Sequence, residues 1–192
     1  MEKENRVVFL KGRKVNLRPI CKETDMEIAL RGANDPELRK FVINSFPISR
    51  EAEADWYDRN SKQRPDEFVL AIETKEGQYL GNIGANHIDW INRVATTGTF
   101  IFQKDCLGKG YGTEAKMLLL NYLFKTLNLR KICSKAKSFN KRSVNYSLKC
   151  GYKIEGVKKK QFFHNGKYHD EIMLAVFSHD WPAIWKKWNK RK

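Results

Sequence analysis

The residues best suited to chemistry lie in the segment Asp105–Ala115, which reads DCLGKGYGTEA. Gly108, Gly110 and Gly112 alternate with other residues, the first of which is Lys109. Glycine adopts positive φ without steric cost and lets a ligand approach the backbone. An apolar run follows, so we expect the loop to open a helix whose N-terminal N–H groups bind phosphate. The spacing matches neither GxxxxGK[ST] nor GxGxxG, which excludes a Walker A loop and a dinucleotide fingerprint.

Hydrophobic periodicity and turn residues predict the elements that position this loop. The expected order is a strand, two helices, three strands, a helix, a strand, a helix, a hairpin and a last helix. The ranges are 14–20, 23–35, 49–62, 67–74, 78–89, 95–103, 113–127, 130–137, 140–152, 161–177 and 179–188. We expect Thr24 or a residue nearby to cap the first helix and Ser49 to cap the second. Gly151 should end the helix at 140–152, and Asn165-Gly166 should form the hairpin turn. This order fits an α/β (α+β) domain with a mostly antiparallel sheet.

Length and composition indicate one globular domain over residues 1–192. The 192 residues are 41% hydrophobic and 31% charged, which is ordinary for a folded protein. No apolar run approaches a membrane span, and the N-terminus lacks signal-peptide architecture. The cysteines lack metal-site spacing, so we expect no metal, no membrane partner and free thiols in a cytoplasmic location.

The formal net charge of +15 raises the question of an anionic partner. Lysines and arginines are spread along the chain, with small clusters only at VKKKQ and WKKWNKRK. That spread is typical of a solvated basic surface, and nucleic acid is not the expected partner. The alternative explanation of the positive charge is that it serves a phosphorylated small ligand.

At this point the sequence resembles the GNAT family of acetyl-CoA-dependent N-acetyltransferases. The family loop, (Arg/Gln)-x-x-Gly-x-(Gly/Ala), matches LGKGYG except at Leu107. Further similarity lies in NRVATTGTFIFQ, LNLRKI, NKRSVNYSLKCGYKIEG and FFHNGKYHDEIML. These segments are similar to the branch with ribosomal-protein and polyamine acetyltransferases. The resemblance implies a single GNAT-like domain with a mixed sheet flanked by helices, a core of about 14–177 and a C-terminal helix of about 178–190.

The resemblance also implies a site for acetyl-CoA as co-substrate. The pyrophosphate would lie on the loop residues Leu107, Gly108, Lys109, Gly110, Tyr111, Gly112 and Thr113. Lys109 is either a counter-charge or a solvated loop lysine. The pantetheine arm would pair with the backbone of Phe100, Ile101 and Phe102. Asn140, Arg142 and Ser143 would border the cofactor, and Asn140 is also a candidate N-cap.

The family reaction is direct transfer, in which an amine attacks the thioester and the CoA thiolate leaves. It requires a base or water chain, a proton donor for the sulfur and a backbone N–H at the carbonyl. This chain has Ser147 where many relatives have tyrosine, and Thr96 where many have glutamate. Ser147 is therefore the candidate donor, and His87 and Asp89 are candidate bases. A CoA-binding module with weak or lost catalysis stays open.

The acceptor is left open as a protein N-terminus, a polyamine, an amino sugar or a similar amine. The resemblance puts its site between the N-terminal helices and the closing hairpin, at 41–49, 55–59 and 162–168. Glu51, Asp55 and Asp58 share one face of the second helix and suit a polyamine, or form a solvated face. A homodimer is compatible with the sequence.

Overall fold

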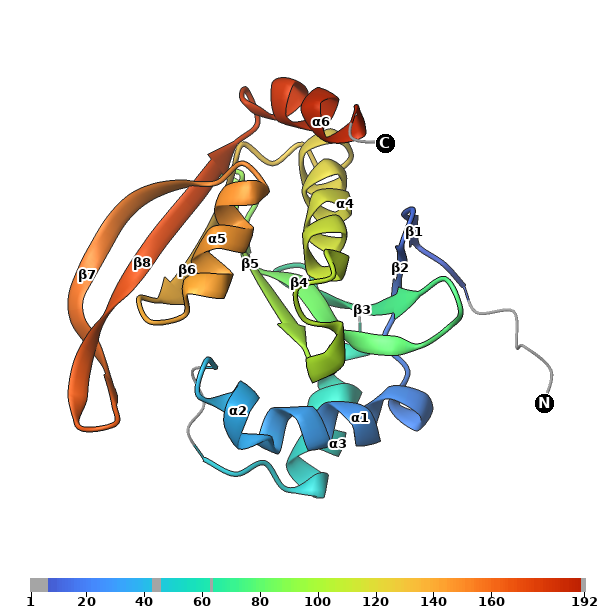
Figure 1. Ribbon diagram of the computed structural model, residues 1–192. Coiled ribbons are helices and arrows are strands. Elements are labelled where there is room, and N and C mark those ends of the chain that lie inside the picture. The colour runs from blue at the N-terminus through green and yellow to red at the C-terminus, as the bar shows by residue number, and fades with distance from the viewer. Residues whose placement is uncertain (1–6, 43–45, 63, 191–192) are drawn as a thin grey trace. The chain divides into compact units, whose positions relative to one another are not determined.

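The computed structural model describes residues 7–42, 46–62 and 64–190 (Figure 1). The strands are β1 (Leu10–Lys11), β2 (Val15–Pro19), β3 (Phe68–Thr74), β4 (Tyr79–Asp89), β5 (Val94–Ile101), β6 (Lys131–Lys137), β7 (Lys153–His164) and β8 (Lys167–Phe177). The helices are α1 (Lys22–Asn34), α2 (Pro36–Arg39), α3 (Arg50–Asn60), α4 (Tyr111–Lys125), α5 (Lys141–Lys149) and α6 (Trp181–Asn189), with a 3₁₀ turn η1 (Lys104–Cys106). Among these residues the strand order is β1-β2-β3-β4-β5-β6-β8-β7.

Two compact units make up the chain. One contains Met1–Gly84 and Thr99–Leu118, and the other contains Ala85–Gly98 and Leu119–Lys192. The elements β4, β5 and α4 each begin in one unit and end in the other. The sheet is mixed: β5 and β6 pair in parallel, whereas β1–β2, β2–β3, β6–β8 and β7–β8 are antiparallel. The mostly antiparallel sheet is confirmed, while the domain bounds 1–192, 14–177 and 178–190 stay predictions.

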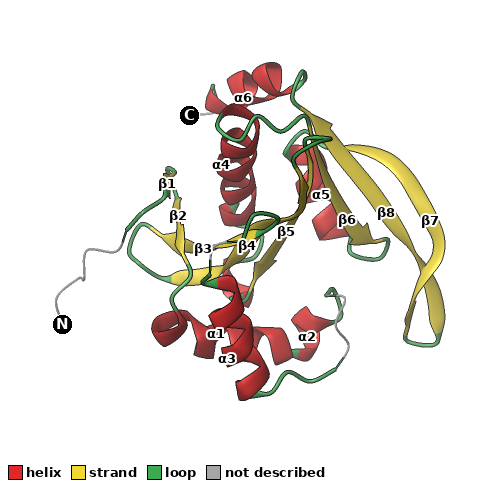
Figure 2. Cartoon of the chain, turned by 180° about the vertical axis from the view of Figure 1, so that it is seen from behind, coloured by secondary structure: helices red, strands yellow, loops and turns green. Residues whose placement is uncertain are grey.

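The first unit packs α1 and α3, which lie side by side in both views, against its strands (Figures 1 and 2). Its buried cluster joins Ala29 of α1, Tyr57 of α3, Ala71 of β3 and Tyr79 of β4. Burial of such side chains is the main source of stability for the unit.

A buried ion cluster also joins β2, α1 and β3. The Arg18 guanidinium donates to Asp25 at 2.7 and 2.8 Å and to Glu73 at 2.6 Å. Asp25 accepts the Cys21 N–H as well, at 2.9 Å. The cap prediction at Thr24 is wrong, because α1 begins at Lys22 and its N-cap Cys21 makes no side-chain cap bond. The Asp25 carboxylate anchors this helix end instead.

Other local predictions in the first unit are confirmed. Ser49 caps α3 by accepting from the Ala52 N–H at 3.1 Å. The short elements β1 and α2 were not predicted. β1 pairs through only two residues, and α2 is a single turn started by Asp35 and Pro36. Periodicity needs a longer window to be detected.

In the second unit, β6, β8 and β7 form a curved antiparallel ribbon (Figure 2). Asn165 and Gly166 have φ of 48° and 75°, which confirms the two-residue hairpin turn. β7 begins at Lys153 rather than 161, because pairing with β8 overrides the lysine run that interrupts its apolar pattern. No described helix has both the length and the apolarity of a membrane span.

The predicted cap and stop of α5 are confirmed, whereas α6 spans Trp181–Asn189 rather than 179–188. Asn140 caps α5 by accepting from the Ser143 N–H at 3.1 Å, and Gly151 follows its end with φ of 93°. In α6, Trp181 is fully buried and its ring lies 5.3 Å from that of Phe124.

Candidate active site

The glycine loop has the predicted backbone at two of its three glycines. Gly108 and Gly110 have φ of 79° and 89°. The expectation for Gly112 is wrong, because α4 begins at Tyr111 and includes Gly112 in its first turn. A Cβ at Gly108 would meet no heavy atom within 4 Å, and one at Gly110 would meet only Lys14 Nζ, at 3.8 Å. The loop therefore faces open space that a ligand can fill.

The N-terminus of α4 supplies donors at this loop. The Glu114 N–H donates to the Gly110 carbonyl at 3.0 Å, in the i to i−4 pattern of the helix. The N–H groups of Tyr111 and Gly112 precede that bond and have no partner inside the helix. They lie at the positive end of the α4 dipole, so the arrangement favours an anion.

Lys14 lies beside the same loop, a position that no sequence pattern indicated. Its Nζ donates to the Lys109 carbonyl at 3.3 Å. The buried Glu114 carboxylate accepts the Lys14 N–H at 2.9 Å and also accepts the Arg13 N–H. Lys14 and Glu114 are 100 residues apart in sequence, which is far outside the reach of periodicity arguments.

The end of β5 has one edge turned to β4. The Phe102 N–H donates to the Leu80 carbonyl at 2.8 Å. The Phe100 carbonyl is also the nearest atom to a Cβ built on Gly81 of β4. Backbone groups of successive residues in a strand point to opposite edges. The N–H and C=O of Ile101 therefore face away from β4.

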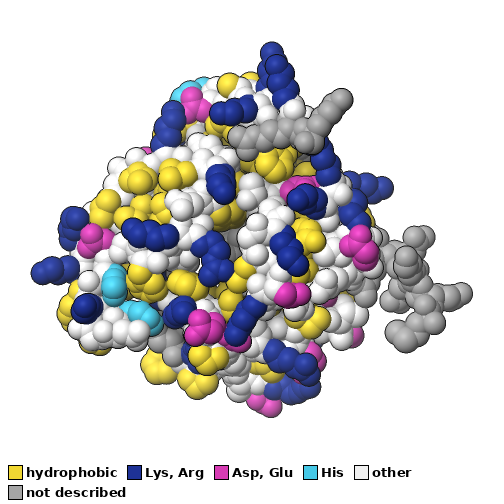
Figure 3. All heavy atoms as spheres, in the orientation of Figure 1, with side chains coloured by type: hydrophobic (Ala, Val, Ile, Leu, Met, Phe, Trp, Pro, Cys, Tyr) yellow, Lys and Arg dark blue, Asp and Glu magenta, His cyan; other side chains and the backbone are white. Residues whose placement is uncertain are grey.

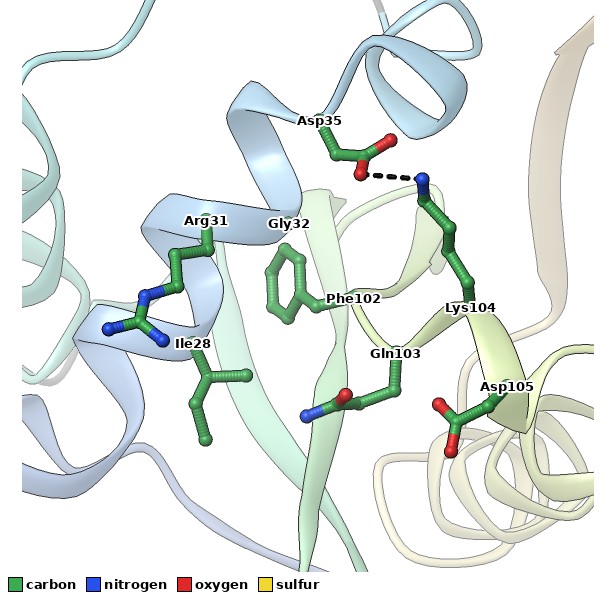
Figure 4. A pocket seen from close by; sticks show the side chains of 8 residues that line it. All are labelled: Ile28, Arg31, Gly32, Asp35, Phe102, Gln103, Lys104 and Asp105. Carbon is green, nitrogen blue, oxygen red and sulfur yellow. Dashed lines mark ion pairs between the residues drawn. The ribbon is translucent and has the colours of Figure 1, made fainter.

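A hollow of about 430 Å³ lies between α1 and the segment after β5 (Figure 4). It is lined by Ile28, Arg31, Gly32, Asp35, Phe102, Gln103, Lys104 and Asp105. Lys104 pairs with Asp35 at 2.7 Å, and this hydrogen bond lowers the pKa of the Asp35 carboxyl. The Phe102 ring lies against Gly32, where an added Cβ would be 2.5 Å from Phe102 Cβ. The hollow thus combines an apolar wall with charges of both signs.

Ser147, the candidate proton donor, is buried on α5. It is 1% exposed, and its Oγ has no hydrogen-bond partner in the described part of the chain. Its neighbour Tyr146 is partly buried. An unpaired buried hydroxyl costs free energy of folding, so a structural role does not explain this serine.

The two candidate bases lie at the end of β4 and differ in their surroundings. Asp89 accepts from Asn92 N at 2.8 Å and from Asn92 Nδ2 at 2.7 Å. These bonds, the backbone one first, lower the pKa of Asp89. His87 is exposed and has a φ of 51°. Asp89 is thus engaged in the turn, whereas the His87 side chain is open to solvent.

The remaining predicted residues lie at the start of α5 and on α3. Arg142 is exposed and Ser143 is partly buried, next to the Asn140 cap. The acidic face of α3 is solvent-exposed, and Asp58 there pairs with Lys22 at 2.6 Å. In the predicted acceptor segment 41–49, residues 43–45 lie outside the described residues.

Comparison with known proteins identifies the family. The acetyltransferase (GNAT) domain model matches residues 14–153. The chain belongs to the GNAT acetyltransferase family. The predicted fold is confirmed, and with it the class of activity: acetyl transfer from acetyl-CoA to an amine.

Individual relatives come from the predicted branch. The chain is 27% identical over 170 residues to spermidine N(1)-acetyltransferase of Escherichia coli strain K12, covering 88% of this chain and 89% of that protein. It is 29% identical over 108 residues to Bacillus subtilis YdaF, named for ribosomal N-acetyltransferase activity, covering 56% of this chain and 58% of that protein. The crystal structure of Vibrio cholerae spermidine N-acetyltransferase with CoA and spermine shares the fold, with a TM-score of 0.80, 22% identity and coverage of 88% and 98%.

Proposed function

We propose that this GNAT acetyltransferase binds the pyrophosphate of acetyl-CoA on Leu107–Thr113 and takes its amine acceptor in the hollow beside α1. The observation that carries the proposal is the open glycine loop at the N-terminus of α4. Gly108 and Gly110 have positive φ, and a Cβ added at either residue would meet no heavy atom within 4 Å other than Lys14 Nζ. The N–H groups of Tyr111 and Gly112, which precede the first helical bond, then meet an anion at the positive end of a 15-residue helix.

The pantetheine arm pairs with β5 through Ile101. The Phe102 N–H is already bonded to β4, and the Phe100 carbonyl points toward Gly81 of β4, so these two residues support the strand from behind. Main-chain pairing of this kind adds a ligand to a sheet edge as a further strand. Asn140, Arg142 and Ser143 are proposed as cofactor contacts from the resemblance to the family alone.

In the reaction, the amine nitrogen attacks the thioester carbonyl carbon, the C–S bond breaks, and the CoA thiolate takes up a proton. The attacking amine loses a proton to a base. His87 is the better candidate for that base, because hydrogen bonds to Asn92 hold the pKa of Asp89 low. Ser147 is the proposed donor to the sulfur, since its buried hydroxyl has no protein partner among the described residues.

The acceptor is a primary amine. Spermidine is the first acceptor to test, because three of the relatives are named for it. Two observations argue against a polyamine acceptor. The acidic face of α3 is exposed to solvent, and Asp35 in the hollow is already paired with Lys104. Peptides with free N-termini and amino sugars complete the panel.

A second candidate function is a CoA-binding module without turnover. It is favoured by the engagement of Asp89 in a turn and by the burial of Ser147. We also propose a cytoplasmic location, supported by four cysteines that are all unbridged and by the need for acetyl-CoA.

The test is calorimetric binding of CoA to Gly110→Val. A β-branched residue is strained at a φ of 89° and places carbon where the pyrophosphate lies. We expect affinity to fall by about tenfold or more, the scale of a lost charge-assisted hydrogen bond. Gly77→Val is the matched control, because Gly77 has a φ of 93° and open space in the β3–β4 turn.

Equal CoA affinity in Gly110→Val and wild type would overturn the pyrophosphate assignment. Product formation by wild type on the amine panel separates the enzyme from the binding module. CoA binding without product on any amine would favour the module.

A further inference from the structure

The β1–β2 turn, residues 12–14, is fixed to the start of α4. The Glu114 carboxylate accepts two successive N–H groups of this turn, from Arg13 and Lys14. A Cβ on Gly12 would collide with the same carboxylate oxygen, so the turn approaches as closely as glycine allows. From the other side, Lys75 Nζ donates to the Gly12 carbonyl at 2.8 Å. The backbone of Lys14 is therefore held in place.

The held backbone aims the Lys14 side chain at the glycine loop. Its Nζ lies 3.3 Å from the Lys109 carbonyl oxygen and 3.8 Å from the position of a Cβ on Gly110. The side chain is exposed, and a single neutral carbonyl is a weak partner for an ammonium. A phosphate oxygen would form a shorter, charge-assisted bond at the same place.

The negative charge of Glu114 explains why anion binding at the loop needs the Lys14 ammonium. A carboxylate in the first turn of α4 stabilises the helix dipole but repels an anion bound at the helix N-terminus. Glu114 is 5% exposed, so water screens its charge poorly. The Lys14 ammonium offsets that charge on the side where the loop is open.

We propose that Lys14 is a cofactor-binding residue that contacts the pyrophosphate of acetyl-CoA, and that Glu114 is its positioning residue. This inference rests on the proposed function, in which the glycine loop binds that pyrophosphate. Because Lys14 approaches from the β1–β2 turn, the pyrophosphate is bound by two segments that lie 95 residues apart.

The experiment measures binding of CoA, dephospho-CoA and pantetheine to wild type, Lys14→Ala and Lys14→Arg. We expect Lys14→Ala to lose about tenfold in affinity for CoA and for dephospho-CoA, and nothing for pantetheine, which lacks the pyrophosphate. Lys14→Arg keeps the charge and should retain most of the affinity. Lys11→Ala, which removes an exposed lysine of β1, is the matched control and should bind like wild type.

Glu114 is tested by the same titrations. Glu114→Gln keeps an oxygen that accepts the two N–H groups, so CoA affinity should be retained or raised. Glu114→Ala frees the turn and should lower affinity for CoA but not for pantetheine. Thermal unfolding of each variant shows whether the fold is kept.

Some results would overturn this inference and leave the proposed function intact. One is that Lys14→Ala binds CoA as tightly as wild type does. Another is that Lys14→Ala loses as much affinity for pantetheine as for CoA. The inference would also be overturned if Lys14→Ala loses affinity for CoA but not for dephospho-CoA, because Lys14 would then contact the 3′-phosphate. If wild type binds pantetheine as tightly as CoA, the pyrophosphate site itself fails and the proposed function fails with it.

Discussion

At the scale of single residues, the Ser147 hydroxyl is the feature that most needs an explanation. Burying a hydroxyl without a partner costs about 1–3 kcal/mol, and Ser147 Oγ is such a group within the described chain. Alanine at this position would fold at least as well. This unpaired hydroxyl is the observation that supports the proposed role of Ser147 as proton donor.

Ser147→Ala is expected to lower turnover by on the order of 10²-fold, typical of general acid assistance. CoA affinity should stay nearly unchanged, because a donor needed late in the reaction stabilises the transition state. Steady-state kinetics with calorimetry measures both quantities. Thermal unfolding should show equal or higher stability.

Tyr146→Phe is the matched control for the neighbouring hydroxyl. If Tyr146→Phe carries the loss and Ser147→Ala is silent, the donor role belongs to Tyr146. Ser147→Tyr restores the family residue but introduces a ring at a position that is 1% exposed. We expect it to lose stability through overpacking.

At the scale of elements, the approach of α1 to the end of β5 shapes the hollow that we propose for the acceptor. Gly32 is buried in the last turns of α1 and lies directly against Phe102 (Figure 4). Phe102 also contacts Phe100 at 4.8 Å and Tyr79 at 5.9 Å between ring centroids. These two rings and Gly32 hold the Phe102 ring in place, so a larger side chain on α1 would have to displace it.

Gly32→Ala is expected to lower the free energy of unfolding by about 1–2 kcal/mol. Overpacking costs about 1–3 kcal/mol, and the gain in helix propensity returns at most about 1 kcal/mol. Chemical denaturation measures the change. Phe102→Ala removes two of the three nearest contacts but keeps the Cβ, so a double-mutant cycle should show that it relieves part of the cost. A stability gain in Gly32→Ala would contradict the tight packing.

At the scale of the whole molecule, the positive charge is distributed. Lys and Arg side chains are scattered over the face in Figure 3, between acidic and hydrophobic groups. A nucleic-acid-binding protein usually gathers such charge into a stripe. The net charge of +15 instead raises the local concentration of small anions, of which acetyl-CoA is one.

CoA affinity is therefore expected to fall steadily as salt rises from about 0.05 to 0.5 M, because the Debye length shrinks through about 10 Å at 0.1 M. Titrations at several salt concentrations measure this dependence. Pantetheine, which carries no phosphate, is the control and should bind equally at all of them. Dephospho-CoA should bind less tightly if Arg142 or Lys141 contacts the 3′-phosphate. A CoA affinity that salt leaves unchanged would show that the positive charge serves something else.

The sequence by itself determined the features that depend on neighbouring residues. Asn165-Gly166 required a tight hairpin turn, and Ser49 and Asn140 supplied caps, because each acts on backbone groups within three residues. Gly108 and Gly110 marked the positive-φ loop for the same local reason. The family followed from the order of several such motifs.

Only the tertiary structure decided which distant groups meet. It placed Lys14 at the glycine loop through Glu114, set Gly32 against Phe102, and started α1 two residues before Thr24 through Arg18 and Asp25. The contacts of Lys14 span 95 to 100 residues, and no periodicity or spacing reports them. They form because packing forces these backbones together, and the polar groups buried there must then find partners.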